Sequence, residues 1–142
     1  QLLGEYYKPH DKPKLSGIGL FPAYTVASSD RMIGNIVVES EFGKLVGFEN
    51  HSGKTYLEKG AQSLGKVIKG FGNNGEDGTE GCIYKNAIGT YMHGSLLPKN
   101  PVLTDFLIQK ALEIKYGKEI KLELLNDDLE NQAQRAIISK IC

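Results

Sequence analysis

The sequence is poor in cysteine and histidine, and it carries no excess of charge of either sign. Its two cysteines, Cys82 and Cys142, are too few for a disulfide framework, so we expect a reducing, cytoplasmic location. Three histidines without a cysteine pair argue against a zinc site. Basic and acidic residues both number 17, which gives a formal net charge of +0 and no basic excess for a nucleic-acid partner.

Long apolar runs and nucleotide-binding loops are missing as well. No apolar run approaches the roughly 18 residues of a membrane helix, so we expect no membrane insertion. The first residues lack the charge, apolar stretch and small-residue site of a signal peptide. No Gly-x-x-x-x-Gly-Lys-Ser/Thr loop occurs, so we expect no cofactor in this chain and assign any use of ATP to a partner.

The remaining composition is that of an ordinary globular protein, with 40% hydrophobic and 24% charged residues. We expect one domain over residues 1–142. β-Branched runs predict strands at residues 32–39 and 44–51, joined by a hairpin at 41–43. Other segments are predicted as an irregular crossing at 15–24, a strand at 67–71, a flexible loop at 72–78 and a strand at 82–91.

The first seven residues look like the later part of a helix, with Leu2, Leu3 and Tyr6 on one side. No capping residue opens this helix, which would leave its first N–H groups without partners. We therefore expect the natural protein to continue upstream of Gln1, with processing at that point as the alternative.

The C-terminal third carries two helical patterns. Asn100 and Pro101 are an N-cap and a first-turn proline, and Gly117 is the residue that ends the helix. A second helix is predicted to start near Asp127. We expect it to bury its apolar side, which consists of Leu129, Ala133, Ala136, Ile137 and Ile141. Strands followed by two helices are typical of the second half of an α/β domain.

His93 is the strongest candidate for chemistry. It follows an apolar run and lies in residues 89–94, which read Gly-Thr-Tyr-Met-His-Gly. A histidine at a strand end is held rigidly while its ring faces a cleft, and the flanking glycines allow close approach of a ligand. This is a suitable position for a general acid/base. The structural alternative is a histidine that only forms hydrogen bonds within the fold.

Several motifs together resemble class I glutamine amidotransferases of the cobyric-acid-synthase-like group. Residues 89–94, followed by Leu-Leu-Pro-Lys-Asn-Pro at 96–101, resemble the family's histidine motif. Residues 85–91 match the run that leads into it, and 47–53 are similar to the family's Gly-aromatic-Glu-x-His-x-Gly. Residues 1–4 look like the end of Cys-Gly-Gly-aromatic-Gln-x-x-Gly. Within the group, the resemblance is greatest to glutaminase subunits of lipid II isoglutaminyl synthases.

The resemblance implies an α/β fold, the flavodoxin-like three-layer sandwich of these enzymes. This chain would be its C-terminal part, with strands and hairpins followed by two helices. It also implies that a cysteine attacks the side-chain amide of L-glutamine while His93 transfers the protons. A γ-glutamyl thioester is then hydrolysed, and ammonia passes to a synthetase partner. A thiolate at a helix N-terminus and backbone N–H groups around the oxyanion suit this chemistry.

The nucleophile of this family is not found in the chain. If Gln1 is the glutamine of the motif, the cysteine lies just upstream, so the resemblance implies a domain truncated before Gln1 and silent on its own. Cys82 is a poor replacement because it lies eleven residues before His93. A fully extended run of that length spans roughly 33 Å or more. We interpret Cys82 as a buried structural thiol.

Arg31 is the predicted ligand of the substrate α-carboxylate. It opens a strand, where a guanidinium can bind a carboxylate through two hydrogen bonds, and the resemblance implicates this region in glutamine binding. A surface arginine paired with Asp30 or Glu39 is the equal alternative. Gln1 is a second candidate for substrate binding. Glu49 is a weaker candidate for orienting His93.

By resemblance, the whole enzyme hydrolyses L-glutamine and passes ammonia to a Mur-ligase-like, ATP-dependent subunit, which amidates the D-glutamate of lipid II. Two alternatives stay open. One is the same glutaminase chemistry in cobyric acid synthesis. The other is a non-catalytic module whose pocket at Arg31 and His93 binds a carboxylate ligand or a synthetase partner.

Overall fold

A long β-hairpin forms the centre of the fold in the computed structural model, which describes residues 1–142. β4 (Met32–Ser40) pairs antiparallel with β5 (Gly43–His51), with Met32 opposite His51 at the open end. Three consecutive β-branched residues of β4, Ile36, Val37 and Val38, are fully buried, because both faces of the hairpin are covered in this region. The two strands and their turn were predicted from the sequence, and the structure confirms them.

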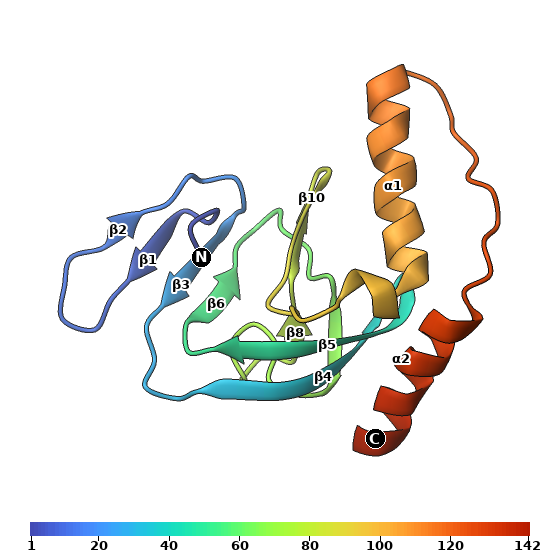
Figure 1. The fold of residues 1–142 in the computed structure, drawn as a ribbon. Helices are drawn as coiled ribbons and strands as arrows, with labels where there is room; N and C mark the ends of the chain where they lie inside the picture. Colours follow the sequence, from blue (N-terminus) through green and yellow to red (C-terminus); the bar gives the residue numbers. More distant parts are fainter.

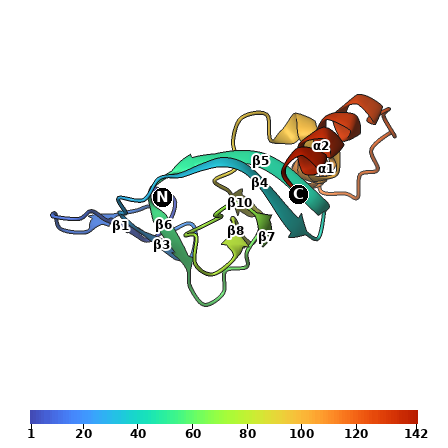
Figure 2. The same ribbon diagram turned by 90° about the horizontal axis from the view of Figure 1, so that it is seen from below.

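The other strands join this hairpin or form a separate sheet beside it (Figure 1). The central sheet has the order β5-β4-β7-β8, a second sheet has the order β2-β1-β3-β6, and β9 and β10 form a hairpin of their own. The bounds are β1 Tyr6–Lys8, β2 Leu15–Ser16, β3 Ala23–Val26, β6 Lys54–Leu57, β7 Gly65–Lys69, β8 Thr79–Glu80, β9 Cys82–Tyr84 and β10 Ala87–Gly89. Figures 1 and 2 place the second sheet at one end of the β4–β5 hairpin and the two helices at the other.

The first seven residues are not helical, so this prediction was wrong. A turn at residues 2–5 leads into β1, which runs parallel to β3. Glu5 N donates to Ala23 O at 2.8 Å, so this segment takes its backbone partners from β3. A seven-residue helix gains too few internal hydrogen bonds to offset its nucleation cost, whereas the aromatic pair Tyr6 and Tyr7 favours a strand.

The glycine-rich segment 72–78 is held by side-chain hydrogen bonds and not by regular structure. Asn73 and Asn74 are buried, and Asn73 bonds both the N–H and the carbonyl oxygen of Gly81. Asn74 Oδ1 accepts from the N–H groups of Glu76 and Asp77. The loop was expected to be flexible, but buried amides with fixed partners give it a defined path.

Residues 82–91 were expected to form one strand, and they form the β9–β10 hairpin followed by a bend at Tyr91. The chain reverses at Lys85 and Asn86, where Lys85 has a φ of 55°. This reversal puts β10 back beside β9, with Gly89 opposite Cys82. The bend after β10 then leads directly to His93.

Helix α1 (Pro101–Tyr116) follows a single 3₁₀ turn, η1 (Leu97–Lys99). Gly117 ends α1 with a φ of 63°, as predicted for a C-terminal glycine. Asn100 precedes the helix as predicted, but its side chain does not cap it. Instead, the Asn100 amide bonds both the N–H and the carbonyl oxygen of Val46 in β5.

Helix α2 (Asp128–Ile141) begins where the sequence predicts, yet its apolar side is not buried. No residue of α2 is buried, and Leu129 is 73% exposed. Ile137 and Ile141 are half-buried because α2 meets β4, β5 and η1, but the helical period does not ensure that the whole apolar side is covered. Neither helix is long and apolar enough to cross a membrane.

Two apolar clusters form the core. The larger lies between the β4–β5 hairpin, Met92 and α1, and the smaller lies beside the second sheet. Their buried members are Ile36, Val38, Leu45, Leu64, Met92 and Leu103 in the first, and Phe21, Ala23 and Cys82 in the second. Strand-rich sheets followed by two helices confirm the α/β class, and Met92 ties the candidate site to the core.

Candidate functional site

His93 is attached to the outer edge of β5 by its backbone. Its N–H donates to Phe48 O at 2.9 Å, and Phe48 N–H donates to His93 O at 3.2 Å. Residues paired in this way face the same side, and the two rings meet edge to face with centroids 6.3 Å apart. The His93 side chain is exposed, so its ring nitrogens are open to a ligand.

The residue before His93 is anchored in the core. Met92 is buried and packs against Gly47 of β5, where an added Cβ would lie 2.6 Å from Met92 Cβ. Glycine is therefore required at residue 47 for this approach. After the histidine, Gly94 turns the chain away with a φ of 66°. The backbone on both sides of His93 is thus fixed by close packing and by a turn.

Arg31 lies at the start of β4 and reaches across to β5, where its Nε–H donates to Asn50 Oδ1 at 2.7 Å. Asn50 is two residues after Phe48, so both side chains are on one face of the strand, about 7 Å apart. Arg31 and His93 therefore lie at two ends of one short stretch of β5. The alternative ion pair of Arg31 with Asp30 does not form, since Asp30 pairs with Lys54 at 3.8 Å.

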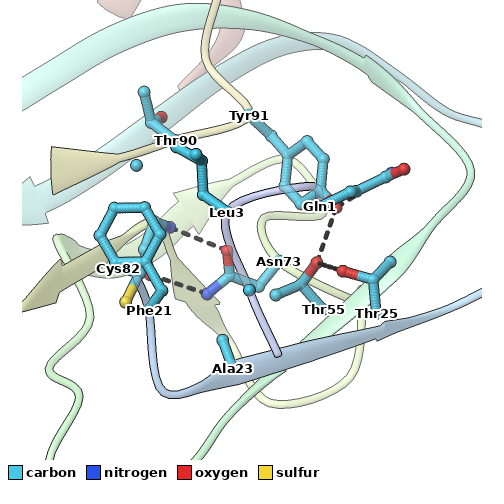
Figure 3. Close-up of a pocket in the computed structure, with 13 residues that line it drawn as sticks. Gln1, Leu3, Phe21, Ala23, Thr25, Thr55, Asn73, Cys82, Thr90 and Tyr91 are labelled. Carbon is cyan, nitrogen blue, oxygen red and sulfur yellow. Dashed lines mark hydrogen bonds between the residues drawn. The ribbon is translucent and has the colours of Figure 1, made fainter. Parts of the chain in front are cut away.

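Gln1 lies in a different pocket, a cavity of about 160 Å³ (Figure 3). Its Nε2 donates to the hydroxyl of Tyr91 at 3.3 Å. That hydroxyl also bonds Thr55, which bonds Thr25, each at 2.7 Å. Neither Arg31 nor His93 lines this cavity. Arg31 and His93 therefore both contact the same stretch of β5, whereas Gln1 lies in the neighbouring cavity and contacts Tyr91, two residues before His93.

Cys82 lines the same cavity from its apolar side, next to Phe21 and Ala23. It is 6% exposed, and burial raises the pKa of its thiol. A buried thiol with a raised pKa is a poor nucleophile. The interpretation of Cys82 as a buried thiol is confirmed.

Glu49 does not orient His93, so this expectation was wrong. Glu49 lies on the opposite face of β5 from Phe48, because successive strand residues alternate. Its carboxylate accepts the N–H groups of Phe71 and Gly72 at 2.7 and 2.9 Å. His51, on the same face, donates through Nδ1 to Gly53 O, and its Nε2 lies 3.8 Å from Glu49 Oε2.

Glu80 and Thr90 were missed by the sequence analysis. Glu80 is fully buried, and its Oε1 accepts from Thr90 Oγ1 at 2.5 Å and from Tyr91 N–H at 2.8 Å. Burial raises the pKa of Glu80, although these hydrogen bonds act in the opposite direction. No local pattern signals this contact, because the two partners are joined only when the β9–β10 hairpin reverses the chain.

Comparison with known families agrees with this architecture. Residues 1–101 match the family described as CobB/CobQ-like glutamine amidotransferase domain, and the chain belongs to this family. The resemblance noted in the sequence is therefore confirmed.

Three individual proteins are similar to this chain over different lengths. The chain is 45% identical over 99% of its length to the subunit GatD of lipid II isoglutaminyl synthase (glutamine-hydrolyzing) from Staphylococcus aureus, covering 57% of that protein. It is 40% identical over 93% of its length to the Streptococcus pneumoniae subunit of the same name, covering 52%. A probable cobyric acid synthase from Methanothermobacter thermautotrophicus is 38% identical over 47% of the chain and is covered over 13% of its own length. The chain thus spans little more than half of the two GatD relatives.

Proposed function

We propose that residues 1–142 form the part of a glutaminase subunit that carries the proton-transfer histidine and the site for the substrate carboxylate. The observation that carries this proposal is the placement of His93 and Arg31 along one short stretch of β5. A guanidinium that can bind a carboxylate and an imidazole that can transfer a proton are the two groups that an amino acid with a side-chain amide requires.

Arg31 is suited to bind the α-carboxylate of L-glutamine. Its Nε–H is used by Asn50, which fixes the plane of the guanidinium. The two terminal nitrogens then remain as paired donors, the geometry that binds a carboxylate through two hydrogen bonds. Asn50 thus orients Arg31. Gln1 is assigned to substrate binding from the neighbouring cavity, through its contact with Tyr91.

His93 is suited to transfer protons at the amide end of the substrate. In the proposed reaction it takes the proton of a cysteine thiol from outside these 142 residues, and the thiolate attacks the side-chain carbonyl. The C–N bond breaks as His93 returns that proton to the departing ammonia. Water, deprotonated by the same imidazole, then hydrolyses the thioester to glutamate and free thiol. Without the cysteine, the chain alone is expected to be silent.

The acceptor of ammonia is proposed from the relatives. Both GatD proteins are described as subunits of a glutamine-hydrolysing lipid II isoglutaminyl synthase. We therefore assign this chain to the same role, in which ammonia passes to a Mur-ligase-like, ATP-dependent subunit that amidates the D-glutamate of lipid II. The cytoplasmic location inferred from the cysteine content stays a prediction.

A second candidate is the same chemistry in cobyric acid synthesis, which the similarity to the Methanothermobacter protein favours. A third is a non-catalytic module that binds a carboxylate ligand or a synthetase partner. The non-catalytic module is favoured because Cys82, the buried cysteine of the chain, lines the cavity beside Gln1 and does not lie at His93 as a nucleophile would.

Ammonia release from L-glutamine tests the proposal, with the chain compared against a form extended upstream through a Cys-Gly-Gly segment. Activity only in the extended form, abolished by His93→Ala and preserved in His10→Ala, would support it. His10 is a matched control because it is also exposed. Arg31→Ala should raise KM for glutamine, whereas Arg135→Ala on α2 should not.

Three results would overturn parts of this assignment. Activity in the unextended chain would point to a nucleophile within residues 1–142. An extended protein that is silent with and without a synthetase partner, yet binds glutamate in calorimetry, would favour the non-catalytic module. Amidation of a corrinoid and not of lipid II by the assembled enzyme would favour the cobyric acid alternative.

A further inference from the structure

A buried carboxyl group lies under the segment that carries His93. Glu80 belongs to β8, the last strand of the central sheet, and it pairs there with Gly65 of β7. Its side chain is fully buried, and Oε1 accepts hydrogen bonds from Thr90 and Tyr91. Neither partner is in a regular strand, so the carboxyl supplies contacts that a neighbouring strand would otherwise provide.

Three successive amide groups leading to His93 each have one acceptor. Tyr91 N–H donates to Glu80 Oε1 at 2.8 Å, Met92 N–H to Thr90 Oγ1 at 2.9 Å, and His93 N–H to Phe48 O at 2.9 Å. The first two acceptors form one unit, because the Thr90 hydroxyl donates to Glu80 while it accepts from Met92. Glu80 therefore fixes the Tyr91 amide directly and the Met92 amide through Thr90.

Removing the Glu80 carboxyl would release this unit. The Tyr91 amide would lose its acceptor, and the Thr90 hydroxyl would lose the partner that sets its rotation. The contacts of Met92 with Gly47 and of His93 with Phe48 would remain, so the segment would stay attached to β5. The expected result is a small shift of the His93 ring, and not its loss from the site.

We propose that Glu80 is a positioning residue for His93, acting through Thr90 and the Tyr91 amide. This role rests on the proposed function of His93 in proton transfer. A displacement of about 1 Å at a reacting group lowers turnover by about a hundredfold, so a carboxyl that never touches the substrate would still control the rate.

The charge of Glu80 is not needed for this role. Its Oε2 is buried without a hydrogen-bond partner, and burial, with the nearby Glu49 carboxylate, favours the neutral form. The contacts that matter are accepted by Oε1, and an amide oxygen accepts hydrogen bonds as well. Glutamine at residue 80 would therefore preserve the positioning, whereas alanine would abolish it. At residue 90, serine would keep the hydroxyl and valine would remove it at similar volume.

Glu49 provides a matched control. It is equally buried and also accepts two backbone N–H groups, but those belong to Phe71 and Gly72 and not to the His93 segment, which Glu49 reaches only indirectly, through the His51 ring that stacks on Tyr91. Glu49→Ala should thus cost stability in the same way as Glu80→Ala without releasing the Tyr91 amide. Comparing these two variants separates positioning from general loss of stability.

The test measures glutaminase kinetics in the full-length protein with its synthetase partner. For Glu80→Ala we expect kcat to fall about tenfold to a hundredfold with KM for L-glutamine changed less than about twofold. Thr90→Val should change kcat in the same direction, Glu80→Gln and Thr90→Ser should restore it, and Glu49→Ala should lower kcat less than about threefold. An equal fall in Glu49→Ala and Glu80→Ala, or unchanged kcat in both Glu80→Ala and Thr90→Val, would overturn the proposal.

A second readout does not depend on turnover. In the 142-residue chain, nuclear magnetic resonance should show faster amide exchange at Tyr91 and Met92 and shifted His93 ring signals in Thr90→Val but not in Thr90→Ser. If the full protein has no glutaminase activity while these shifts appear, the proposed function of His93 fails and the positioning contact stands. If the enzyme is active and His93-dependent but the shifts are absent, the role of Glu80 is wrong.

Discussion

Replacing Asn100 with alanine should cost this protein a large part of its stability, although Asn100 looks from the sequence like an ordinary helix cap. Its side chain is 1% exposed and makes four hydrogen bonds. Oδ1 accepts from Val46 N–H at 2.9 Å and from Gln134 Nε2 at 3.1 Å, and Nδ2 donates to Val46 O at 2.8 Å and to Leu96 O at 2.6 Å.

These bonds close the free edge of the central sheet. β5 is an edge strand, and two of its residues on that edge are paired by the segment that runs from His93 to α1. Phe48 pairs with the backbone of His93, and Val46, two residues earlier, pairs with the side-chain amide of Asn100. Asn100 therefore holds the chain after His93 along β5, as a neighbouring strand would.

At about 1 kcal/mol for each hydrogen bond, Asn100→Ala should lose about 4 kcal/mol, before any cost of the cavity that is left. That is a large share of the roughly 5–15 kcal/mol that stabilises a typical domain. Gln134→Ala should cost less, about 2 kcal/mol, because the two hydrogens of Gln134 Nε2 are shared among Lys44 O, Lys99 O and Asn100 Oδ1 and Val46 keeps both of its partners.

Urea unfolding of the three proteins, followed by circular dichroism, measures these differences, and amide exchange at Val46 reports the local effect. Asn100→Ala should lower the midpoint and expose the Val46 amide, and Gln134→Ala should leave that amide protected. A loss below about 1 kcal/mol for Asn100→Ala would refute the reasoning, since a single average hydrogen bond would then account for it.

Three further predictions concern the surroundings of His93 and the two thiols. Gly47→Ala should destabilise the protein by about 1–3 kcal/mol in urea unfolding, because the new Cβ would displace Met92; an unchanged midpoint would contradict the close packing. The folded-state pKa of Glu80 is raised above its ordinary value of 4.5, so above that pH the native state still binds a proton that the unfolded state has released. Stability is therefore lost as the pH rises above 4.5. The free energy of unfolding of Glu80→Gln, relative to that of the unmutated protein, should thus rise as the buffer changes from acidic to neutral pH. A difference that does not change with pH would contradict a raised pKa of Glu80. With a disulfide reagent, exposed Cys142 should react quickly and buried Cys82 only after unfolding, whereas two equally fast thiols would show that Cys82 is accessible.

Local signals predicted several elements well. Helix α1 begins at Pro101 and ends before Gly117, as predicted, because both residues act through their own backbone geometry. The β-branched run of β4 and the turn after it predicted the central hairpin for the same reason. Where the structure-forming interaction lies within a few residues, the sequence contains all the information that is needed.

Predictions failed where the partner is distant in the sequence. Residues 6–8 form β1 because β3 offers a parallel partner, and the apolar side of α2 is only partly covered where the helix meets β4, β5 and η1. In the candidate site, Glu49 was expected beside His93, but strand alternation places it on the opposite face. Glu80 was not suspected, since its contacts with residues 90 and 91 require the β9–β10 reversal.

The sequence by itself determined the family, the position of the candidate histidine and the residue types around it, because motifs fix which side chains are available. Only the tertiary structure decided which of them meet. It brought Arg31 and His93 to one stretch of β5 and separated Gln1 into a neighbouring cavity. The physical reason is that hydrogen bonds and packing act over a few ångströms in space, and the chain's reversals alone determine which residues come that close.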